Sequence, residues 1–495
     1  MTASFAPFNM AFLSWVALVP LFVALNGASL KEGLYLGFIA GSVHFITLLY
    51  WIIVALGHYG GLNIFASIGI LLLFVSYLAL FPAIFSCLFL FLKDCLFYGI
   101  AVSACWVSLE YARAHLMTGF PWCLFGYTQY KNLYFLQSAD LFGVYGLSFL
   151  IVLVNVSLWS VIFKRRNKGV WIETIITVVV VFATLGYGYH CLSRPFSSQK
   201  HVKDIKVLIV QGNIDQSVKW NPDFRRRTIT TYMDLTEKGI ISGADLVVWP
   251  ETSLPCFFQD NKSIQMLLAG LVKRGGILVF GSPAYSMKGG VLRYYNRAYM
   301  LSPYRGGDIH VQYYDKVHLV PFGEYVPLKT VLGFINRIVP AAGDFEAGNK
   351  IKLLTADGLK IGVLICFEAI FPSLARFHSQ IGANILINLT NDAWFGRTGA
   401  PYQHLSMAVF RAVENRLPMV RAANTGISAI IRQDGRIVAK TDLFRRTTIL
   451  HSINIYRYEP TFYVRYGYLF PVLLIFLSVL ILIHRLKVQK MVSAQ

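Results

Sequence analysis

The chain has 495 residues, of which 56% are hydrophobic and 14% charged, and its formal net charge is +20. Soluble domains usually carry about 25% charged residues, so this composition excludes an ordinary soluble protein. The shortage of charged residues is confined to the N-terminal part, because residues 1–200 hold five of the 25 acidic residues and residues 201–465 hold the other 20. A membrane region followed by a domain in water accounts for both parts.

Seven apolar segments approach the length of about 20 residues that a helix needs to cross a bilayer. We therefore expect an N-terminal transmembrane bundle of about six helices over 1–193, and a C-terminal transmembrane helix with a basic cytoplasmic tail over 467–495. Pro82 is expected to kink the third helix. The apolar segments fall near 9–26, 33–56, 64–92, 95–112, 144–163, 174–192 and 467–483.

Positive charge orients these helices, because short cytoplasmic loops are rich in Lys and Arg. The basic segments 164–168 and 485–490 therefore mark the cytoplasmic side. Alternation of the spans then places the domain over 194–466 outside the cytoplasm. It also places Met1 outside, on the face opposite the C-terminus.

From residue 205 the pattern changes to short β-rich runs separated by helical stretches, which predicts an α/β domain. The predicted strands are 205–214, 245–250, 276–280, 360–365 and 384–389, and the predicted helices are 222–240, 262–274 and 401–416. Residues 318–350 read as a loop, and a loop of this length in a compact domain is usually functional.

The charge and cysteine patterns narrow the partners of this domain. Residues 201–465 hold 32 Lys and Arg against 20 Asp and Glu, about +12. Attraction to anionic lipid headgroups and a merely basic surface both remain open explanations. No nucleic-acid motif accompanies the charge, so nucleic-acid binding is not expected.

Seven scattered cysteines without a CxxC pair predict neither a metal site nor a disulfide framework, and no cofactor is expected.

Three segments carry residues suited to acyl transfer. DLVVWPETSLP contains Glu251 at the end of a buried strand, YYDKVHLVPFGEYVP contains Lys316, and GVLICFEAIFP contains Cys366 at the end of another strand. A thiol can attack a carbonyl, a carboxylate can take the thiol proton, and an ammonium can stabilise the resulting oxyanion. Each of the three could equally be a non-catalytic core, turn or surface residue. Their spacing in the sequence alone does not show that they lie close together in the fold.

The three segments resemble the signatures of the nitrilase (carbon–nitrogen hydrolase) superfamily. The resemblance implies an α-β-β-α sandwich over roughly 205–455, with Glu251 as general base, Lys316 as catalytic lysine and Cys366 as nucleophile. With the membrane region included, the chain resembles the apolipoprotein N-acyltransferase family. This narrower resemblance rests on GFPWCLFGY (119–127), VQGNIDQSVKW (210–220), KVHLVPFGEYVP (316–327) and NDAWFG (391–396).

The resemblance further implies supporting roles around the site for Glu324, Glu368, Asn296 and Trp220. Phe367 stands where the family usually has a tyrosine, so its backbone N–H remains available to an oxyanion but a hydroxyl does not. His318 and His404 are instead expected to be hydrogen-bonded structural histidines, and Asp392 is expected to shape its loop.

The family reaction is ping-pong. The resemblance implies that Cys366 takes an acyl chain from a phospholipid as a thioester. The α-amino group of the diacylglyceryl-cysteine of an apolipoprotein then takes the acyl chain from Cys366. The location implied is a bacterial inner (cytoplasmic) membrane. A membrane-tethered nitrilase-type amidase that passes the acyl group to water is the alternative.

Family members typically have eight spans, and TASFAPF resembles the junction after their first helix, so either a helix precedes Met1 or seven spans suffice.

Overall fold

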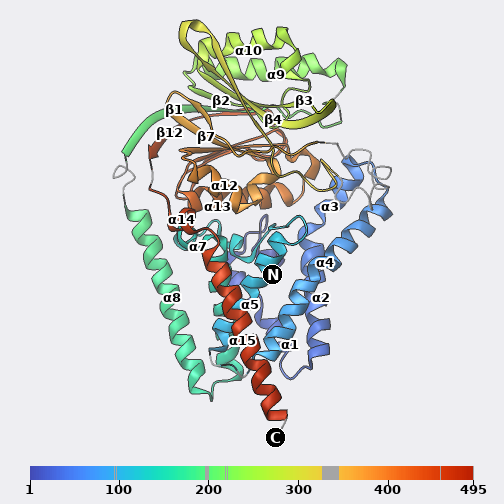
Figure 1. The fold of residues 1–495 in the computed structure, drawn as a ribbon, viewed down its shortest axis with the longest axis vertical. Coiled ribbons are helices and arrows are strands. Elements are labelled where there is room, and N and C mark those ends of the chain that lie inside the picture. The colour runs from blue at the N-terminus through green and yellow to red at the C-terminus, as the bar shows by residue number, and fades with distance from the viewer. Residues whose placement is uncertain are drawn as a thin grey trace. The chain divides into compact units, whose positions relative to one another are not determined.

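The computed structural model describes residues 1–93, 95, 97–194, 200–217, 219, 221–325, 345–457 and 459–493. It divides the chain into two compact units (Figure 1). The helical unit consists of Met1–Ile52, Phe65–Arg194 and Arg465–Gln495, and the α/β unit consists of Ile53–Ile64 and Pro195–Val464. A short segment from the N-terminal third of the sequence is thus part of the α/β unit.

Among the described residues, five helices of the helical unit are long and apolar enough to cross a membrane, namely α2, α4, α7, α8 and α15. A sixth long helix, α5, contains the buried charged residues Glu110 and Arg113. The helices of this part of the chain are α1 (Val19–Ala24), α2 (Leu30–Leu49), α3 (Trp51–Val54), α4 (Ile64–Phe91), α5 (Tyr98–His115), α6 (Leu133–Leu136), α7 (Ala139–Phe163), α8 (Lys168–Ser193) and α15 (Leu469–Ser493).

The predicted span over 9–26 is not one continuous helix. A 3-10 helix covers Ala11–Trp15, and the α-helix α1 begins at Val19 with Pro20 in its first turn. Proline lacks a backbone N–H and is tolerated in the first turn of a helix but not in its interior, which explains why α1 begins there. By contrast, Pro82 lies inside α4, and this helix continues through it.

Close packing of α2 against α4 depends on glycine. A Cβ atom added at Gly37 would lie 2.5 Å from the carbonyl oxygen of Pro82 and 2.8 Å from the Cα of Ala83. Small residues let membrane helices approach each other closely, and this approach is the source of their van der Waals attraction. The carbonyl of Pro82 also accepts a hydrogen bond from the Ser86 hydroxyl at 2.9 Å.

The described residues of the α/β unit form two six-stranded sheets. The first has the order β12-β1-β2-β3-β4-β5 and the second has the order β11-β10-β9-β8-β7-β6. The first sheet contains β1 (Lys200–Gln211), β2 (Leu246–Val248), β3 (Ile277–Lys288), β4 (Val291–Pro303), β5 (Ile309–Asp315) and β12 (Thr447–Arg457). The second contains β6 (Leu354–Ala356), β7 (Leu359–Ile365), β8 (Ile385–Thr390), β9 (Met419–Ala423), β10 (Ala429–Ile431) and β11 (Ile437–Lys440).

Helices cover the outer face of each sheet, which confirms the predicted α-β-β-α sandwich (Figure 1). The helices α9 (Pro222–Ile241) and α10 (Lys262–Gly275) pack on the first sheet, and α12 (Pro372–Gln380) and α13 (Ala400–Asn415) pack on the second. A short helix α14 (Phe462–Tyr466) follows β12. Much of the predicted loop, residues 326–344, lies outside the described residues.

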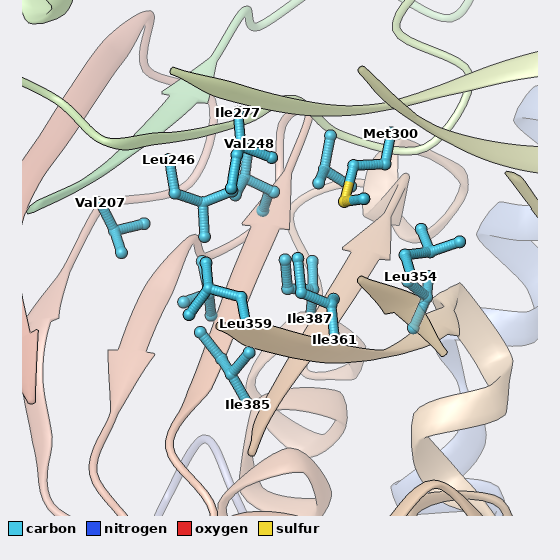
Figure 2. Packing of buried hydrophobic residues seen from close by; sticks show 14 of the residues in the cluster. Val207, Leu246, Val248, Ile277, Met300, Leu354, Leu359, Ile361, Ile385 and Ile387 are labelled. Carbon is cyan, nitrogen blue, oxygen red and sulfur yellow. The ribbon is translucent and has the colours of Figure 1, made fainter. Parts of the chain in front are cut away.

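The main core lies between the two sheets. Side chains such as Val207, Leu246 and Val248 of the first sheet point toward Ile361 and Ile387 of the second (Figure 2). Neighbouring residues of the same strands, Leu208 and Val247 among them, point the other way and pack under α9 and α10. Successive residues of a strand face opposite sides, so strands covered on both faces are apolar throughout. This burial makes the sheets a rigid support for the loops at their strand ends.

Candidate active site

Glu251 lies in a tight turn that follows β2. The next residue, Thr252, has a φ of +45°, which is rare for a β-branched residue. Gly281 of β3 packs directly behind this turn, since a Cβ added there would lie 2.3 Å from the backbone N of Thr252 and 2.7 Å from the Cα of Glu251. The Gly281 N–H also donates to the Pro250 carbonyl at 3.1 Å. The carboxylate is therefore held on a backbone that has little freedom to move.

Lys316 joins two carboxylates and an amide in one buried cluster. Its Nζ lies 2.8 Å from Glu324 Oε2 and 3.8 Å from Glu251 Oε1. Asn296 of β4 donates from Nδ2 to both acids, at 2.7 Å to Glu251 Oε1 and 2.8 Å to Glu324 Oε1. Burial alone would lower the pKa of Lys316, but the negative charges of Glu324 and Glu251 outweigh burial and raise it. The lysine is therefore a permanent cation.

Cys366 follows β7 in a left-handed conformation, with a φ of +51°. Its carbonyl oxygen accepts hydrogen bonds from His404 Nε2 at 3.1 Å and Asn388 Nδ2 at 3.5 Å. Burial raises the pKa of the Cys366 thiol; the charge of Glu251 adds to this effect and the charge of Lys316 opposes it. The thiol is thus protonated at neutral pH and needs a base before it can attack.

Glu368 connects the strand that ends before Cys366 to the segment that carries Lys316. Its Oε1 accepts from the backbone N–H of Val317 at 2.7 Å, from that of His318 at 3.1 Å and from the Tyr314 hydroxyl at 3.1 Å. Its Oε2 accepts from the backbone N–H of Ile365 at 2.7 Å. Burial raises the pKa of Glu368 to about 7. Its contacts bridge the end of β5 in one sheet and the end of β7 in the other.

His404 and Asp392 support the backbone of Cys366 from the second sheet. His404 Nδ1 lies 3.0 Å from Asp392 Oδ1, and Arg421 Nη2 donates to Asp392 Oδ2 at 2.7 Å. Burial would raise the pKa of Asp392, but Arg421 and His404 outweigh it and hold the pKa low, and burial lowers the pKa of His404. Both residues are buried and hydrogen-bonded, which matches the structural roles that the sequence predicted for them.

Aromatic contacts surround His318. Its ring lies 3.8 Å from that of Phe371 and 6.1 Å from that of Phe367, measured between centroids. Burial and the nearby Lys316 lower the pKa of His318 to about 4, so the ring is neutral. Trp220, the remaining predicted site residue, lies outside the residues that the structure describes.

One buried lysine that the sequence reasoning missed lies against the turn of Glu251. Lys219 is 1% exposed, and its Nζ donates to Thr252 Oγ1 at 2.6 Å and to the Glu251 carbonyl at 3.4 Å. Burial lowers the pKa of Lys219 to about 8. Its place beside Trp220 in VQGNIDQSVKW is the signal that could have found it.

The segment Ile53–Ile64 contacts the NDAWFG turn. Tyr59 meets Trp394 edge to face with ring centroids 6.0 Å apart, and a Cβ added at Gly396 would lie 3.1 Å from Val54. Residues 55–59 form a π-helical turn, a rare conformation that is frequent at functional sites.

Comparisons with known proteins cover both units. Residues 1–157 match the apolipoprotein N-acyltransferase N-terminal domain, and residues 206–462 match carbon-nitrogen hydrolase. The apolipoprotein N-acyltransferase of Geobacter metallireducens is 43% identical over 92% of this chain and 88% of its own length. That of Methylococcus capsulatus is 35% identical over 90% of this chain and 86% of its own length.

Solved structures that resemble this chain cover about half of it. The carbon-nitrogen hydrolase of Helicobacter pylori aligns with a TM-score of 0.38 and 16% identity, over 51% of this chain and 89% of that chain. Nit3 of Saccharomyces cerevisiae, a member of the nitrilase superfamily, aligns with a TM-score of 0.38 and 18% identity, over 52% of this chain and 91% of that chain.

Proposed function

Because the chain belongs to the apolipoprotein N-acyltransferase family, we propose that it acylates apolipoproteins through a thioester on Cys366. The acyl donor is a phospholipid, and the acceptor is the N-terminal amino group of a diacylglyceryl-modified cysteine. The observation that carries the proposal is the meeting of three groups from two sheets. Glu251 and Lys316 follow strands of the first sheet, Cys366 follows a strand of the second, and the charges of the first two act on the thiol.

In the first half-reaction, Glu251 takes the proton from Cys366 as the sulfur attacks the carbonyl carbon of the phospholipid ester. Negative charge then develops on the former carbonyl oxygen, and the permanent cation Lys316 stabilises it together with the backbone N–H of Phe367. The C–O bond breaks, and Glu251 returns the proton to the departing alkoxide. The products are a lysophospholipid and an acyl thioester on Cys366.

In the second half-reaction, the α-amino group of the acceptor attacks the thioester carbon. Glu251 accepts a proton from the attacking nitrogen, and Lys316 again faces the oxyanion. The C–S bond breaks, and the sulfur regains its proton from Glu251. The product is an amide, and Cys366 is restored for the next cycle.

A membrane location fits both substrates, since a phospholipid and a diacylglyceryl-cysteine each reside in the bilayer. Five apolar helices make the chain a multi-pass membrane protein. The basic segments 164–168 and 485–490 support a bacterial inner membrane location with the α/β unit outside the cytoplasm. Labelling of single-cysteine variants in sealed vesicles tests the orientation, since Ser493→Cys should react only from the cytoplasmic side.

Intact-mass measurement tests the proposed function. The purified full chain is incubated with phospholipid that carries a labelled acyl chain, and a peptide with an N-terminal diacylglyceryl-cysteine is then added. We expect a mass increase of one acyl group on Cys366, lost when the peptide becomes N-acylated. Cys366→Ala should show neither step, whereas Cys256→Ala, which removes another free and partly buried cysteine of the same unit, should show both.

Two outcomes would contradict the proposal. Labelled fatty acid released into water without peptide acylation would favour the amidase-type alternative. Peptide acylation by Cys366→Ala at the wild-type rate would rule out the thioester.

A further inference from the structure

We propose that Lys219 is a positioning residue of this active site, a second buried cation that anchors the turn of Glu251 and balances the charge of the carboxylates. The inference rests on the proposed function in one respect, that Cys366 is the nucleophile. Lys219 comes from the segment between β1 and α9, separate from the strands that carry the three catalytic groups.

The contacts of Lys219 converge on the turn of the base. Its ammonium donates to Thr252 Oγ1 at 2.6 Å and to the main-chain carbonyl of Glu251 at 3.4 Å. Behind the same turn, Gly281 leaves no space, because a Cβ there would lie 2.3 Å from the Thr252 nitrogen. The turn is thus held from one side by backbone packing and from the other by the Lys219 ammonium. This explains how Thr252 keeps its unfavourable φ of +45°.

The positive charge of Lys219 also affects the net charge of the buried cluster. Without it, Lys316 is the single cation that the described contacts place against the two carboxylates Glu251 and Glu324, which leaves one uncompensated negative charge. Such a charge beside a thiol opposes its ionisation and opposes the oxyanion that follows. The positive charge of Lys219 brings the cluster of two lysines and two glutamates to neutrality.

The charged groups that face these residues allow a pH test. Lys219 interacts with Glu251 and Cys366, and the thiol of Cys366 also interacts with Lys316 and Asp392. Burial lowers the pKa of Lys219 to about 8, while the charges of Glu251 and Cys366 oppose this effect. The ammonium is therefore charged at neutral pH and loses its proton as the pH rises above about 8.

A role confined to anchoring, in which the charge of Lys219 has no effect and only its hydrogen bond to Thr252 matters, predicts a different result. In that case Thr252→Val, which keeps the branched shape and removes the hydroxyl, should have the same effect as loss of the lysine. If the charge matters, Thr252→Val should leave the ionisation of Cys366 unchanged, because Lys219 stays in place.

Alkylation of Cys366 by iodoacetamide separates these roles without any lipid substrate. The rate of modification of the full chain in detergent is followed by mass spectrometry of the Cys366 peptide from pH 6 to pH 10. The variants are Lys219→Met, Lys219→Arg, Thr252→Val and Lys262→Met, the last of which removes an exposed lysine from α10 as a matched control. A cooperative thermal unfolding transition establishes that each variant is folded.

We expect Lys219→Met to reduce the alkylation rate at pH 7 about tenfold. The difference from the wild-type chain should disappear above about pH 8, where the lysine itself is neutral. Thr252→Val and Lys262→Met should keep the wild-type rate at pH 7, and Lys219→Arg, which keeps the charge, should stay closer to the wild-type rate than Lys219→Met. If Lys219→Met does not fold, Lys219→Gln removes the charge and keeps an N–H donor, and it should show the same loss of rate at pH 7.

A wild-type rate at pH 7 in the folded charge-removing variant would overturn the inference, and so would an equal loss of rate in Thr252→Val. The failure of the proposed function looks different. An unreactive Cys366 in the wild-type chain, or normal alkylation without any acyl transfer to the peptide, would count against the proposed reaction rather than against the charge effect of Lys219.

Discussion

Asn296→Leu tests whether the amide between the two carboxylates is needed to orient the base. The Asn296 side chain is 4% exposed and donates at 2.7 Å to Glu251 and at 2.8 Å to Glu324. Leucine has the same branching at Cγ and no donor. Each carboxylate then loses one buried hydrogen bond, while Lys316 remains 2.8 Å from Glu324 and 3.8 Å from Glu251. The lysine should then favour Glu324, and Glu251 should lose its alignment.

The size of the effect follows from the two lost bonds. A hydrogen bond to a charged group contributes about 1.5–3 kcal/mol, so we expect the free energy of unfolding to fall by about 3 kcal/mol or more. If a similar amount is lost in the transition state, thioester formation slows about 100-fold, because about 1.4 kcal/mol corresponds to a factor of ten.

Rapid-quench mass spectrometry of the acyl-enzyme measures this rate, and denaturant unfolding in detergent measures the stability. The matched control is Arg293→Gln on the same strand. It breaks an exposed ion pair with Glu346, whose atoms lie 3.1 Å apart, and should change stability by less than about 1 kcal/mol. Thioester formation by Asn296→Leu within threefold of the wild-type rate would refute the reasoning.

Three further predictions follow from the same site. Lys316→Arg keeps the charge, but a planar guanidinium does not fit the compact cluster at 2.8 Å from Glu324, so thioester formation should fall at least 100-fold in the acyl-enzyme assay; near-normal rates would argue against the oxyanion role. Gly281→Ala should displace the turn of Glu251 and lower the unfolding midpoint and the acylation rate together, and a change in neither would show that the turn adapts. The pKa of Glu368 is raised from 4.5 to about 7, so the folded chain holds this proton more tightly, and stability should decrease by up to about 3 kcal/mol as the pH rises from 4.5 to 7. Unfolding midpoints across this range should lose that slope in Glu368→Gln, and an unchanged slope would assign it to other groups.

The sequence by itself determined the elements whose pattern is strong and local. The apolar run at 64–92 became α4, Ile64–Phe91, and the run at 360–365 became β7, Leu359–Ile365. Both are apolar without interruption, because each must bury its surface in lipid or between two layers. The run at 9–26 looked equally apolar, yet it is divided into two short helices, with Pro20 in the first turn of the second.

Other elements needed the tertiary structure. The strand β12, Thr447–Arg457, alternates between partly buried and exposed positions at the edge of its sheet, so it lacks the apolar run that marks a central strand. It forms because β1 offers a long antiparallel partner, from the pair Gln211 and Thr447 to the pair Lys200 and Arg457. Pairing between segments more than 200 residues apart is not encoded in either segment alone.

The active site divides in the same way. The residue types and the family resemblance led to the prediction of Glu251, Lys316 and Cys366 from the amino-acid sequence. Their meeting was decided by the packing of the two sheets, since strands from separate sheets carry the carboxylate and the thiol. Lys219 shows the limit of the sequence most clearly. The sequence alone predicts a solvated charge for a lysine in a polar stretch. The proposed role of Lys219 rests on its burial to 1% exposure against the turn of Glu251, which the fold alone creates.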